Sequence, residues 1–553
     1  MNNQLLADLL YPNITKTPAD YENIYPKRAL DDNAEVMRIA PSPTGFIHLG
    51  NLYGALADER IAHQSNGVFF LRIEDTDNKR LVKGAVETII STFDYFKIEF
   101  DEGAEVKNNN GNHYGPYYQR QRTDIYQAYA KDLVRKGLAY PCFCDEEHLK
   151  QQRTKQQELK ITTGYYGPWA VCRNLDFELI KANIEANKSF VIRLRSNGDP
   201  KIKHSFHDEI KGDITVIEND QDVILLKADG IPTYHFAHAV DDHLMHTTIV
   251  LRGEEWLGTL PIHLELFKAL NHPLPKFAHT SQLMKMDNGI KRKLSKRKDP
   301  ELSLDYYRQL GYHPDAVKIY LMTLLNWNFE EWFLKNPDAD ITAFKFSVNK
   351  MGQSGALFDL DKLNNISKTF LSKKEPEEIM MYLKNFVQEN DASKMDIYFK
   401  DEAYLLQILN LGMGTNLKKR RKDYIYASQI LASIAYYFDD VYQPSYDFIF
   451  DKSLCIKIIE AFIANYDHRD DNAQWFDKLK AIATQFNIAA EMNDYKNNPD
   501  AYIGNISELA EVLRVATTGY KNTPDLWSIM QIMQEKRVLT RLHQALDTLN
   551  GKM

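Results

Sequence analysis

The segment from Val36 to Leu71 constrains the fold more than any other part of this chain. It begins with the apolar run VMRIA and the loop PSPTGFIHLG. A helical pattern from Asn51 to Ser65 follows, and then a second apolar run, VFFLRI, from Val68. A strand, a crossover helix and a second strand form a parallel βαβ unit. The expected fold class is therefore α/β, with a parallel sheet at its centre.

The loop between the first strand and the helix is suited to binding an anion. A helix that begins after a parallel strand presents unpaired N–H groups and the positive end of its dipole, where phosphate or carboxylate can bind. Gly45 and Gly50 leave room for a ligand beside the backbone, and His48 can add a donor. For this stretch alone, an ordinary turn with a capping or packing histidine explains the residues equally well.

A second stretch, KMDNGIKRKLSKRKDPELSL, carries seven basic residues between Lys285 and Lys298. Alone, such a run is typical of a solvated surface. Together the two stretches indicate an enzyme that uses ATP to make an acyl adenylate. That reaction places negative charge on the α-phosphate and on the departing pyrophosphate, which needs donors from both sides. The glycine-rich loop would supply one side and mobile lysines the other.

The bulk properties fit a large cytoplasmic enzyme. A chain of 553 residues exceeds the ~250–300 at which a single core stops growing, so several domains are expected. No segment reaches the ~18 apolar residues of a membrane span, and the first residues lack the pattern of a signal peptide. Four cysteines do not make a disulfide scaffold. The net charge of −8 argues against indiscriminate nucleic-acid binding but allows a local basic face.

Both stretches resemble the signatures of class I aminoacyl-tRNA synthetases, and the chain is most similar to the bacterial-type glutamyl-tRNA synthetases. HLGN at His48–Asn51 resembles the HIGH motif, and KLSKR at Lys293–Arg297 resembles KMSKS. HLGN lacks the second histidine, and KLSKR has Leu for Met and Arg for the last Ser. The similarity covers nearly the whole chain after residue 35, through RIEDTD, GLAYPCFC, PTYHFAHAVDDHLM, LRGEEW and EVLRVATTG.

The resemblance implies a Rossmann-type parallel-sheet catalytic domain with an inserted acceptor-binding domain, followed by a mainly α-helical anticodon-binding region. We expect an N-terminal extension of unassigned role at 1–33 and the catalytic domain at 34–115 and 225–285. The insertion would occupy 116–224. A stem-contact region with the KLSKR loop would occupy 286–365, and the helical anticodon-binding domain 366–553.

The chemistry implied by the resemblance has two steps. L-glutamate and ATP, with Mg²⁺, give glutamyl adenylate and pyrophosphate, and the terminal ribose of tRNA(Glu) then takes the glutamyl group. We expect a monomer; whether tRNA(Gln) is also charged stays open. A glutaminyl-tRNA synthetase is one alternative, but it usually ends in a β-barrel, whereas this C-terminal third has a helical pattern. A non-catalytic RNA-binding paralogue should have lost His48 or the lysines at 293 and 296, and all three are present.

The resemblance also implies which residues form the site. The catalytic residues would be His48, Lys293 and Lys296, and ATP would also contact Gly45, Gly50, Asn51 and Ser295. Glutamate would contact Arg38, Ser42, Glu74, Tyr234, Arg252 and Trp256. Each arginine could grip one carboxylate through its bidentate fork, and which takes which stays open. Structural salt bridges and core packing are the ordinary alternatives for these residues. His238 stands where relatives often have Asn or an apolar residue, so its contact with substrate also stays open.

Two further groups have a weaker signal. Cys142, Cys144 and Cys172 resemble a zinc site of part of the family, in which a tyrosine, here Tyr165 or Tyr166, completes the tetrahedron. Three buried thiols without metal are the alternative. For RNA, KKRRKDYIY combines basic residues with tyrosines able to stack on unpaired bases, and a solvated basic helix end explains it equally well. The basic residues proposed for tRNA are Lys418, Lys419, Arg420 and Arg421.

Overall fold

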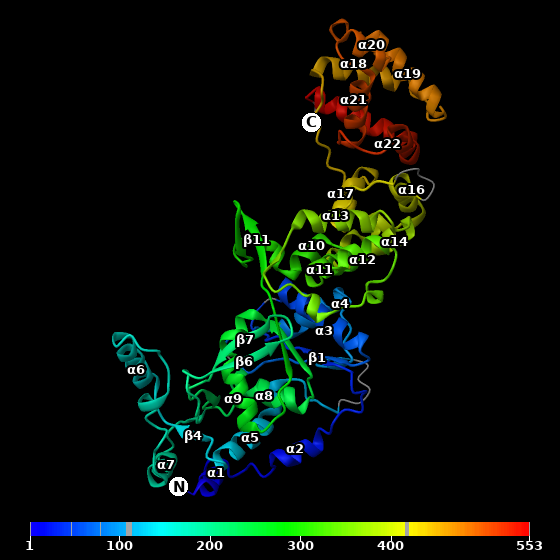
Figure 1. Ribbon diagram of the computed structural model, residues 1–553. Helices are drawn as coiled ribbons and strands as arrows, with labels where there is room; N and C mark the ends of the chain where they lie inside the picture. Colours follow the sequence, from blue (N-terminus) through cyan, green and yellow to red (C-terminus); the bar gives the residue numbers. More distant parts are fainter. Residues whose placement is uncertain (1, 46, 78, 107–112, 415–419, 552–553) are drawn as a thin grey trace. The chain divides into compact units, whose positions relative to one another are not determined.

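The computed structural model describes residues 2–45, 47–77, 79–106, 113–414 and 420–551 (Figure 1). The chain forms two compact units. The first comprises Met1–Arg308 with Val317–Leu360, and the second comprises Gln309–Ala316 with Asp361–Met553. Among the described residues, every strand belongs to the first unit, and the second is built from helices. No helix in these ranges combines the length and the apolar character needed to cross a membrane.

Parallel strands form the centre of the first unit, which confirms the predicted α/β class. One sheet has the order β1-β2-β3, with β1 Val36–Ile39, β2 Val68–Leu71 and β3 Glu102–Gly103. A second parallel pair joins β9 Ile249–Gly253 to β10 Lys276–Thr280. The backbone N–H of Thr248 donates to the carbonyl of Val36 at 3.0 Å, which brings β9 alongside β1. The carboxyl ends of β1 and β9 therefore meet at one edge.

Helix α3, Leu49–Gln64, is the crossover between β1 and β2, and it begins two residues before the predicted Asn51. Its start is capped because the backbone N–H of His48 donates to Asn51 Oδ1 at 3.0 Å. The helix is buried from Leu52 through Ala62 on all sides, which explains why its sequence has no single apolar stripe. The other helices that flank the parallel strands in the chain are α4 Ala85–Tyr95, α8 Tyr234–Leu244 and α9 Leu260–Leu270.

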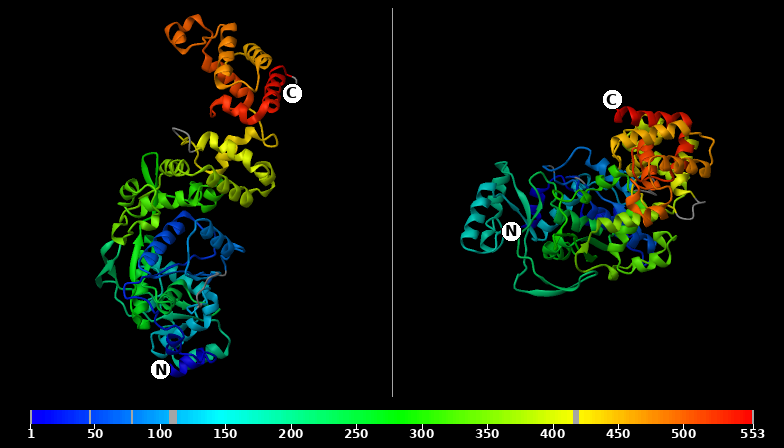
Figure 2. Two further views of the ribbon diagram at one scale, coloured as in Figure 1. Left: turned by 90° about the vertical axis from the view of Figure 1, so that its right-hand side faces the viewer. Right: turned by 90° about the horizontal axis from the view of Figure 1, so that it is seen from above.

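The segment between the two halves of the parallel sheet folds around an antiparallel sheet of order β4-β5-β8 (Figures 1 and 2). Its strands are β4 Ala139–Cys142, β5 Val191–Leu194 and β8 Ile224–Leu226, and its helices are α5 Thr123–Arg135, α6 Glu146–Glu158 and α7 Phe177–Glu185. A hairpin of β6 Lys203–Asp208 and β7 Gly212–Ile217 returns to the parallel strands. There the ring of Phe206 lies 6.0 Å from that of Phe277 on β10.

The N-terminal extension is docked on α5 through two helices, α1 Asn3–Leu10 and α2 Pro18–Ile24. Leu6 is 3% exposed, and Lys131 Nζ on α5 donates to the carbonyls of Tyr11 at 3.1 Å and Ile14 at 3.0 Å. Further along, Arg28 forms an ion pair with Glu102 at 2.8 Å. The extension is thus part of the first unit, through apolar burial and charged hydrogen bonds.

A small sheet of order β12-β11-β13 leads into the KLSKR sequence, which begins at the last residue of β12. Its strands are β11 Leu283–Asp287, β12 Ile290–Lys293 and β13 Ala356–Leu357, and β11 and β12 form an antiparallel hairpin. The helices that follow are α10 Leu304–Leu310, α11 Pro314–Leu325 and α12 Phe329–Lys335.

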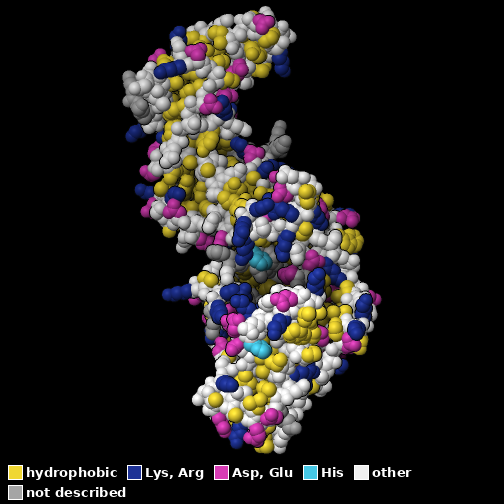
Figure 3. Space-filling view, turned by 90° about the vertical axis from the view of Figure 1, so that its left-hand side faces the viewer, with side chains coloured by type: hydrophobic (Ala, Val, Ile, Leu, Met, Phe, Trp, Pro, Cys, Tyr) yellow, Lys and Arg dark blue, Asp and Glu magenta, His cyan; other side chains and the backbone are white. Residues whose placement is uncertain are grey.

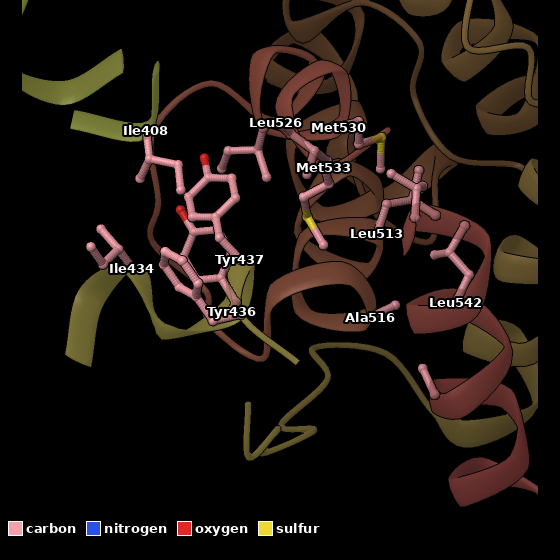
Figure 4. Packing of buried hydrophobic residues seen from close by; sticks show 14 of the residues in the cluster. Ile408, Ile434, Tyr436, Tyr437, Leu513, Ala516, Leu526, Met530, Met533 and Leu542 are labelled. Carbon is pink, nitrogen blue, oxygen red and sulfur yellow. The ribbon is translucent and has the colours of Figure 1, made fainter. Parts of the chain in front are cut away.

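The second unit confirms the predicted helical C-terminal region. Its apolar core includes Tyr436, Tyr437, Leu513, Met530 and Leu542, which Figure 4 shows in close view. Its helices are α13 Leu360–Leu371, α14 Pro376–Asn390, α15 Met395–Phe399, α16 Glu402–Met413, α17 Ala427–Ile434, α18 Lys452–Asn465, α19 Asn472–Gln485, α20 Met492–Asn497, α21 Ile506–Thr518 and α22 Leu526–Leu549.

Candidate active site

A cleft opens in the first unit where β1, β2 and β9 end. Ligands of open parallel sheets bind at such carboxyl ends. Its volume of about 980 Å³ is at the upper end of the ~300–1,000 Å³ usual for small-molecule sites, so it can hold more than one amino acid. Among the predicted residues, the cleft is lined by Arg38, Ser42, His48, Gly50, Asn51, Glu74, Tyr234, Arg252, Trp256, Lys293 and Lys296.

Some predicted residues do not line the cleft or lie outside the described part of the chain. Gly45 and Ser295 are not part of this lining; a Cβ on Gly45 would be 3.9 Å from Lys296 Nζ, and the Ser295 backbone N–H donates to Asp299 at 2.8 Å. Of the basic run in the second unit, Arg420 pairs with Glu375 at 3.0 Å and Arg421 with Asp423 at 2.6 Å. Lys418 and Lys419 lie outside the described residues.

His48 and Gly50 form the side of the cleft at the start of α3. A Cβ on Gly50 would lie 3.0 Å from His48 Cε1, so a larger residue here would crowd the imidazole. Nδ1 of His48 is buried and has no hydrogen-bond partner among the described residues. Burial lowers the pKa of His48, and the nearby cations Lys296 and Lys293 lower it further. The imidazole is therefore neutral at neutral pH and can donate one hydrogen bond.

Lys293 and Lys296 line the same cleft, and ion pairs hold the β11–β12 hairpin to the segment that follows it. Arg292 donates to both oxygens of Asp299, at 2.6 and 2.8 Å, and Lys285 binds Glu301. Lys293 and Lys296 form no ion pair within the described ranges, so their charges stay available to an anion. Figure 3 shows a face on which Lys and Arg side chains gather around a hollow that contains a histidine side chain.

A buried network of opposite charges lies behind the cleft. Arg38 Nε donates to Asp242 Oδ1 at 3.1 Å, and Arg72 joins Asp242 at 2.7 Å and Glu74 at 3.2 Å. Burial works against the charge of Asp242, but Arg38 and Arg72 hold its pKa well below the usual range. For Glu74, burial dominates over the same two arginines and raises the pKa to about 7. Glu74 is thus the member of the network that titrates near neutrality.

Arg252 on β9 has surroundings of a different kind. Its Nε donates to His279 Nε2 at 3.0 Å, and its Nη1 lies 2.9 Å from His263 Nδ1. The Arg252 guanidinium is centred 5.0 Å from the ring of Phe277, while Nη2 is buried without a partner among the described residues. Tyr234 and Trp256, with ring centroids 4.4 Å apart, form an apolar wall of the same cleft.

The three cysteines of the inserted segment come together around one tyrosine. Cys144 Sγ lies 3.5 Å from Cys172 Sγ, and Tyr165 Oη lies 3.4 Å from Cys142 Sγ and 3.3 Å from Cys144 Sγ. The hydroxyl of Tyr166 instead donates to the carbonyl of Thr162 at 2.6 Å. Of the two tyrosines that the sequence left open, the geometry thus places Tyr165 in the cluster.

Sequence analysis gave no role to three buried residues that contact the predicted arginines: Asp242, His263 and His279. The signal available for Asp242 was an acidic pair, Asp241 and Asp242, inside the otherwise apolar pattern of AVDDHLM. For the two histidines the sequence offered no such signal, because a lone histidine in an apolar run is usually a core residue.

Comparison with known proteins shows the family of this chain. Residues 35–392 match the model of the catalytic domain of tRNA synthetases class I (E and Q), and the chain belongs to this family. It is 53% identical to a glutamate–tRNA ligase of Acetivibrio thermocellus, over 99% of this chain and 100% of that protein. The glutamate–tRNA ligase of Clostridium perfringens strain 13 is 46% identical, over 98% of this chain and 100% of that protein.

A solved structure has a similar fold. The crystal structure of a glutamate tRNA ligase from Elizabethkingia meningosepticum in complex with its amino acid has a TM-score of 0.71 at 27% identity, and the match covers 94% of this chain and 100% of that one. The similarity therefore includes the helical unit as well as the catalytic domain.

Proposed function

We propose that this chain is a glutamate–tRNA ligase that uses ATP to activate L-glutamate and transfers the glutamyl group to the 3′-terminal ribose of tRNA(Glu). The activity named for its relatives supports this proposal. The observation that carries it is the pairing, in one cleft, of a buried arginine with a free Nη2 and two lysines without ion-pair partners in the described ranges. The first group suits a carboxylate, and the second suits phosphates.

In the first step, the α-carboxylate of glutamate attacks the α-phosphorus of ATP, and the bond to pyrophosphate breaks. His48, Lys293 and Lys296 would bind the phosphate oxygens as negative charge moves onto pyrophosphate. Mg²⁺ would accompany ATP as part of the substrate and neutralise phosphate charge. In the second step, a ribose hydroxyl attacks the activated carbonyl and AMP leaves. Most of the rate would come from positioning and electrostatics, since neither step needs a protein nucleophile.

Glutamate would be held by its three charges. Arg38 and Arg252 would each bind a carboxylate, and Glu74 would accept from the α-ammonium group, with Ser42 beside it. Tyr234 and Trp256 would enclose the aliphatic part of the side chain. We also propose that residues 116–224 contact the acceptor stem and residues 366–553 the anticodon, as the family resemblance implies.

The proposal is tested by charging purified tRNA(Glu) and tRNA(Gln) with labelled glutamate and glutamine. We expect glutamate on tRNA(Glu) and almost no reaction with glutamine, because a neutral amide leaves a buried guanidinium without its counter-ion; such polar mismatches reach factors of ~10⁴–10⁵. Glutamine used about as well as glutamate would favour a glutaminyl enzyme instead. No adenylate with either amino acid would favour a non-catalytic paralogue. The yield with tRNA(Gln) shows whether the enzyme also charges that tRNA.

Replacement of Lys296 by Ala should lower the rate of adenylate formation by a factor of about 10² or more, the scale for losing one transition-state donor. Glutamate-dependent ATP–pyrophosphate exchange measures this rate. Lys291→Ala is the matched control, because Lys291 lies five residues before Lys296 in the same basic run but donates to the carbonyl of Gly355 at 2.8 Å. If both variants lose the same activity, or if neither does, Lys296 does not bind the leaving group.

Acidification should weaken glutamate binding through Glu74. Its pKa of about 7 in the free protein means that protonation removes the carboxylate below pH 7. Since kcat/KM reports the free enzyme, its value for glutamate should fall as the pH drops below 7, approaching tenfold per pH unit. In Glu74→Gln, kcat/KM should be low and should lose this step. An unchanged pH profile in Glu74→Gln would exclude Glu74 as the titrating group.

We further propose that Cys142, Cys144, Cys172 and Tyr165 bind zinc. The sulfur atoms of Cys142, Cys144 and Cys172 lie within 4.8 Å of one another, as three ligands of a structural zinc site would. Tyr165 Oη, 3.4 Å from Cys142 Sγ and 3.3 Å from Cys144 Sγ, would be the fourth donor. Hydrogen bonds from Cys144 and Cys172 lower the pKa of Cys142, with a further contribution from the nearby Arg193, which favours a thiolate there. Bound zinc would tie β4 to the loop that carries Cys172.

The purified protein should therefore contain about one equivalent of zinc by elemental analysis. Cys144→Ser should release the metal and make residues 142–172 more sensitive to limited proteolysis. Cys455→Ser is the control, because Cys455 is a buried cysteine of the helical unit. If the purified protein is metal-free but fully active, and Cys144→Ser is cleaved no faster than the unmodified protein, the three cysteines are thiols that bind no metal.

A further inference from the structure

The hydrogen bonds around Arg252 determine the protonation of two histidines. A guanidinium has only donors, so the nitrogens that face it, His279 Nε2 at 3.0 Å and His263 Nδ1 at 2.9 Å, must both accept. An accepting ring nitrogen carries no proton. Both imidazoles are therefore neutral, with the proton on Nδ1 of His279 and on Nε2 of His263.

Groups beyond the two histidines fix the same tautomers. Nδ1 of His279 donates to Asp208 Oδ2 at 2.6 Å, and Asp208 is held by the backbone N–H groups of Ile210 at 3.0 Å and Lys211 at 2.8 Å. Nε2 of His263 lies 2.9 Å from His235 Nδ1, which accepts its proton. Burial lowers the pKa of His263 and His279, in agreement with neutral rings. Each acceptor of Arg252 thus has its own support.

The two arginines of the cleft differ in how their charge is compensated. Arg38 shares the buried carboxylate of Asp242 with Arg72. Arg252, which is 8% exposed, forms no ion pair with a carboxylate in the described part of the chain, and an imidazole separates it from Asp208. Its acceptors orient the guanidinium without cancelling its charge. A carboxylate in their place would compete with a substrate carboxylate for the same cation.

We propose that His263 and His279 are positioning residues for substrate recognition, which act as neutral acceptors that fix the plane of Arg252 and leave its full charge and its Nη2 for a carboxylate of glutamate. Asp208 supports His279 from the β6–β7 hairpin, so this hairpin contributes indirectly to the amino-acid site. The inference rests on the proposed assignment of Arg252 to glutamate and does not depend on which carboxylate Arg252 binds.

The test compares His263→Asn with His263→Asp in the full-length chain. Asn places an oxygen acceptor where Nδ1 lies, and Asp has the same shape but adds a negative charge. We expect Asn to keep the KM for glutamate within a few-fold of the unmodified protein. Asp should raise this KM about tenfold or more, the scale of one charged hydrogen bond, and leave the KM for ATP unchanged. Glutamate-dependent pyrophosphate exchange gives both constants, and thermal unfolding confirms that each variant is folded.

His279 provides a second, independent pair. His279→Gln keeps an acceptor near the position of Nε2, whereas His279→Leu removes it and leaves Arg252 Nε unpaired. His279→Leu should raise the KM for glutamate but not the KM for ATP. In His279→Gln the KM for glutamate should stay close to that of the unmodified protein.

The proposal would be overturned if His263→Asn and His263→Asp had equal KM values for glutamate and if His279→Leu had no higher KM for glutamate than His279→Gln. A parallel rise in the KM for ATP would also overturn it, because a general structural role would then explain the loss. An unmodified protein that forms no glutamyl adenylate would instead contradict the proposed function itself.

Discussion

One buried carboxylate connects the parts from which the cleft is built. Asp242 on α8 accepts hydrogen bonds from Arg38 on β1 and from Arg72 just after β2, and all three side chains are almost fully buried. These strands and α8 belong to the two halves of the parallel-sheet domain, which the inserted segment separates in the chain. Removing one partner from such a buried group leaves an uncompensated charge, at a cost of about 3–5 kcal/mol. The position of Arg38 relative to α8 therefore depends on Asp242.

The cations in and around the cleft differ in their partners. Arg38, which lines the cleft, and Arg72 and Arg292, which do not, are paired with carboxylates. Lys293 and Lys296 have no such partner among the described residues, and Arg252 is held by neutral acceptors alone. A chain with a net charge of −8 thus maintains a local concentration of uncompensated positive charge. Local pairing, rather than overall composition, determines where an anion can bind.

The elements that could be predicted from the sequence are those whose signals lie within a short stretch of the chain. The strand, loop and helix around His48 follow from apolar runs and glycine placement, and α3 begins two residues from its predicted start. Contacts between distant segments gave no such signal: Arg38 and Asp242 are 204 residues apart, and His279 is 27 residues from Arg252. For Ser295 the structure adds a backbone hydrogen bond to Asp299, which the motif did not indicate, and its contact with ATP stays a prediction.

The β6–β7 hairpin also bears on how such proteins can be recombined. The inserted segment has its own antiparallel sheet and looks exchangeable as a module between relatives. Yet the hairpin carries Asp208, which fixes the tautomer of His279 and through it the orientation of Arg252. A chimera that received a foreign insertion would need an equivalent acidic residue at that hairpin end. In such a chimera, the β6–β7 hairpin should therefore be kept with the parallel strands rather than exchanged with the rest of the insertion.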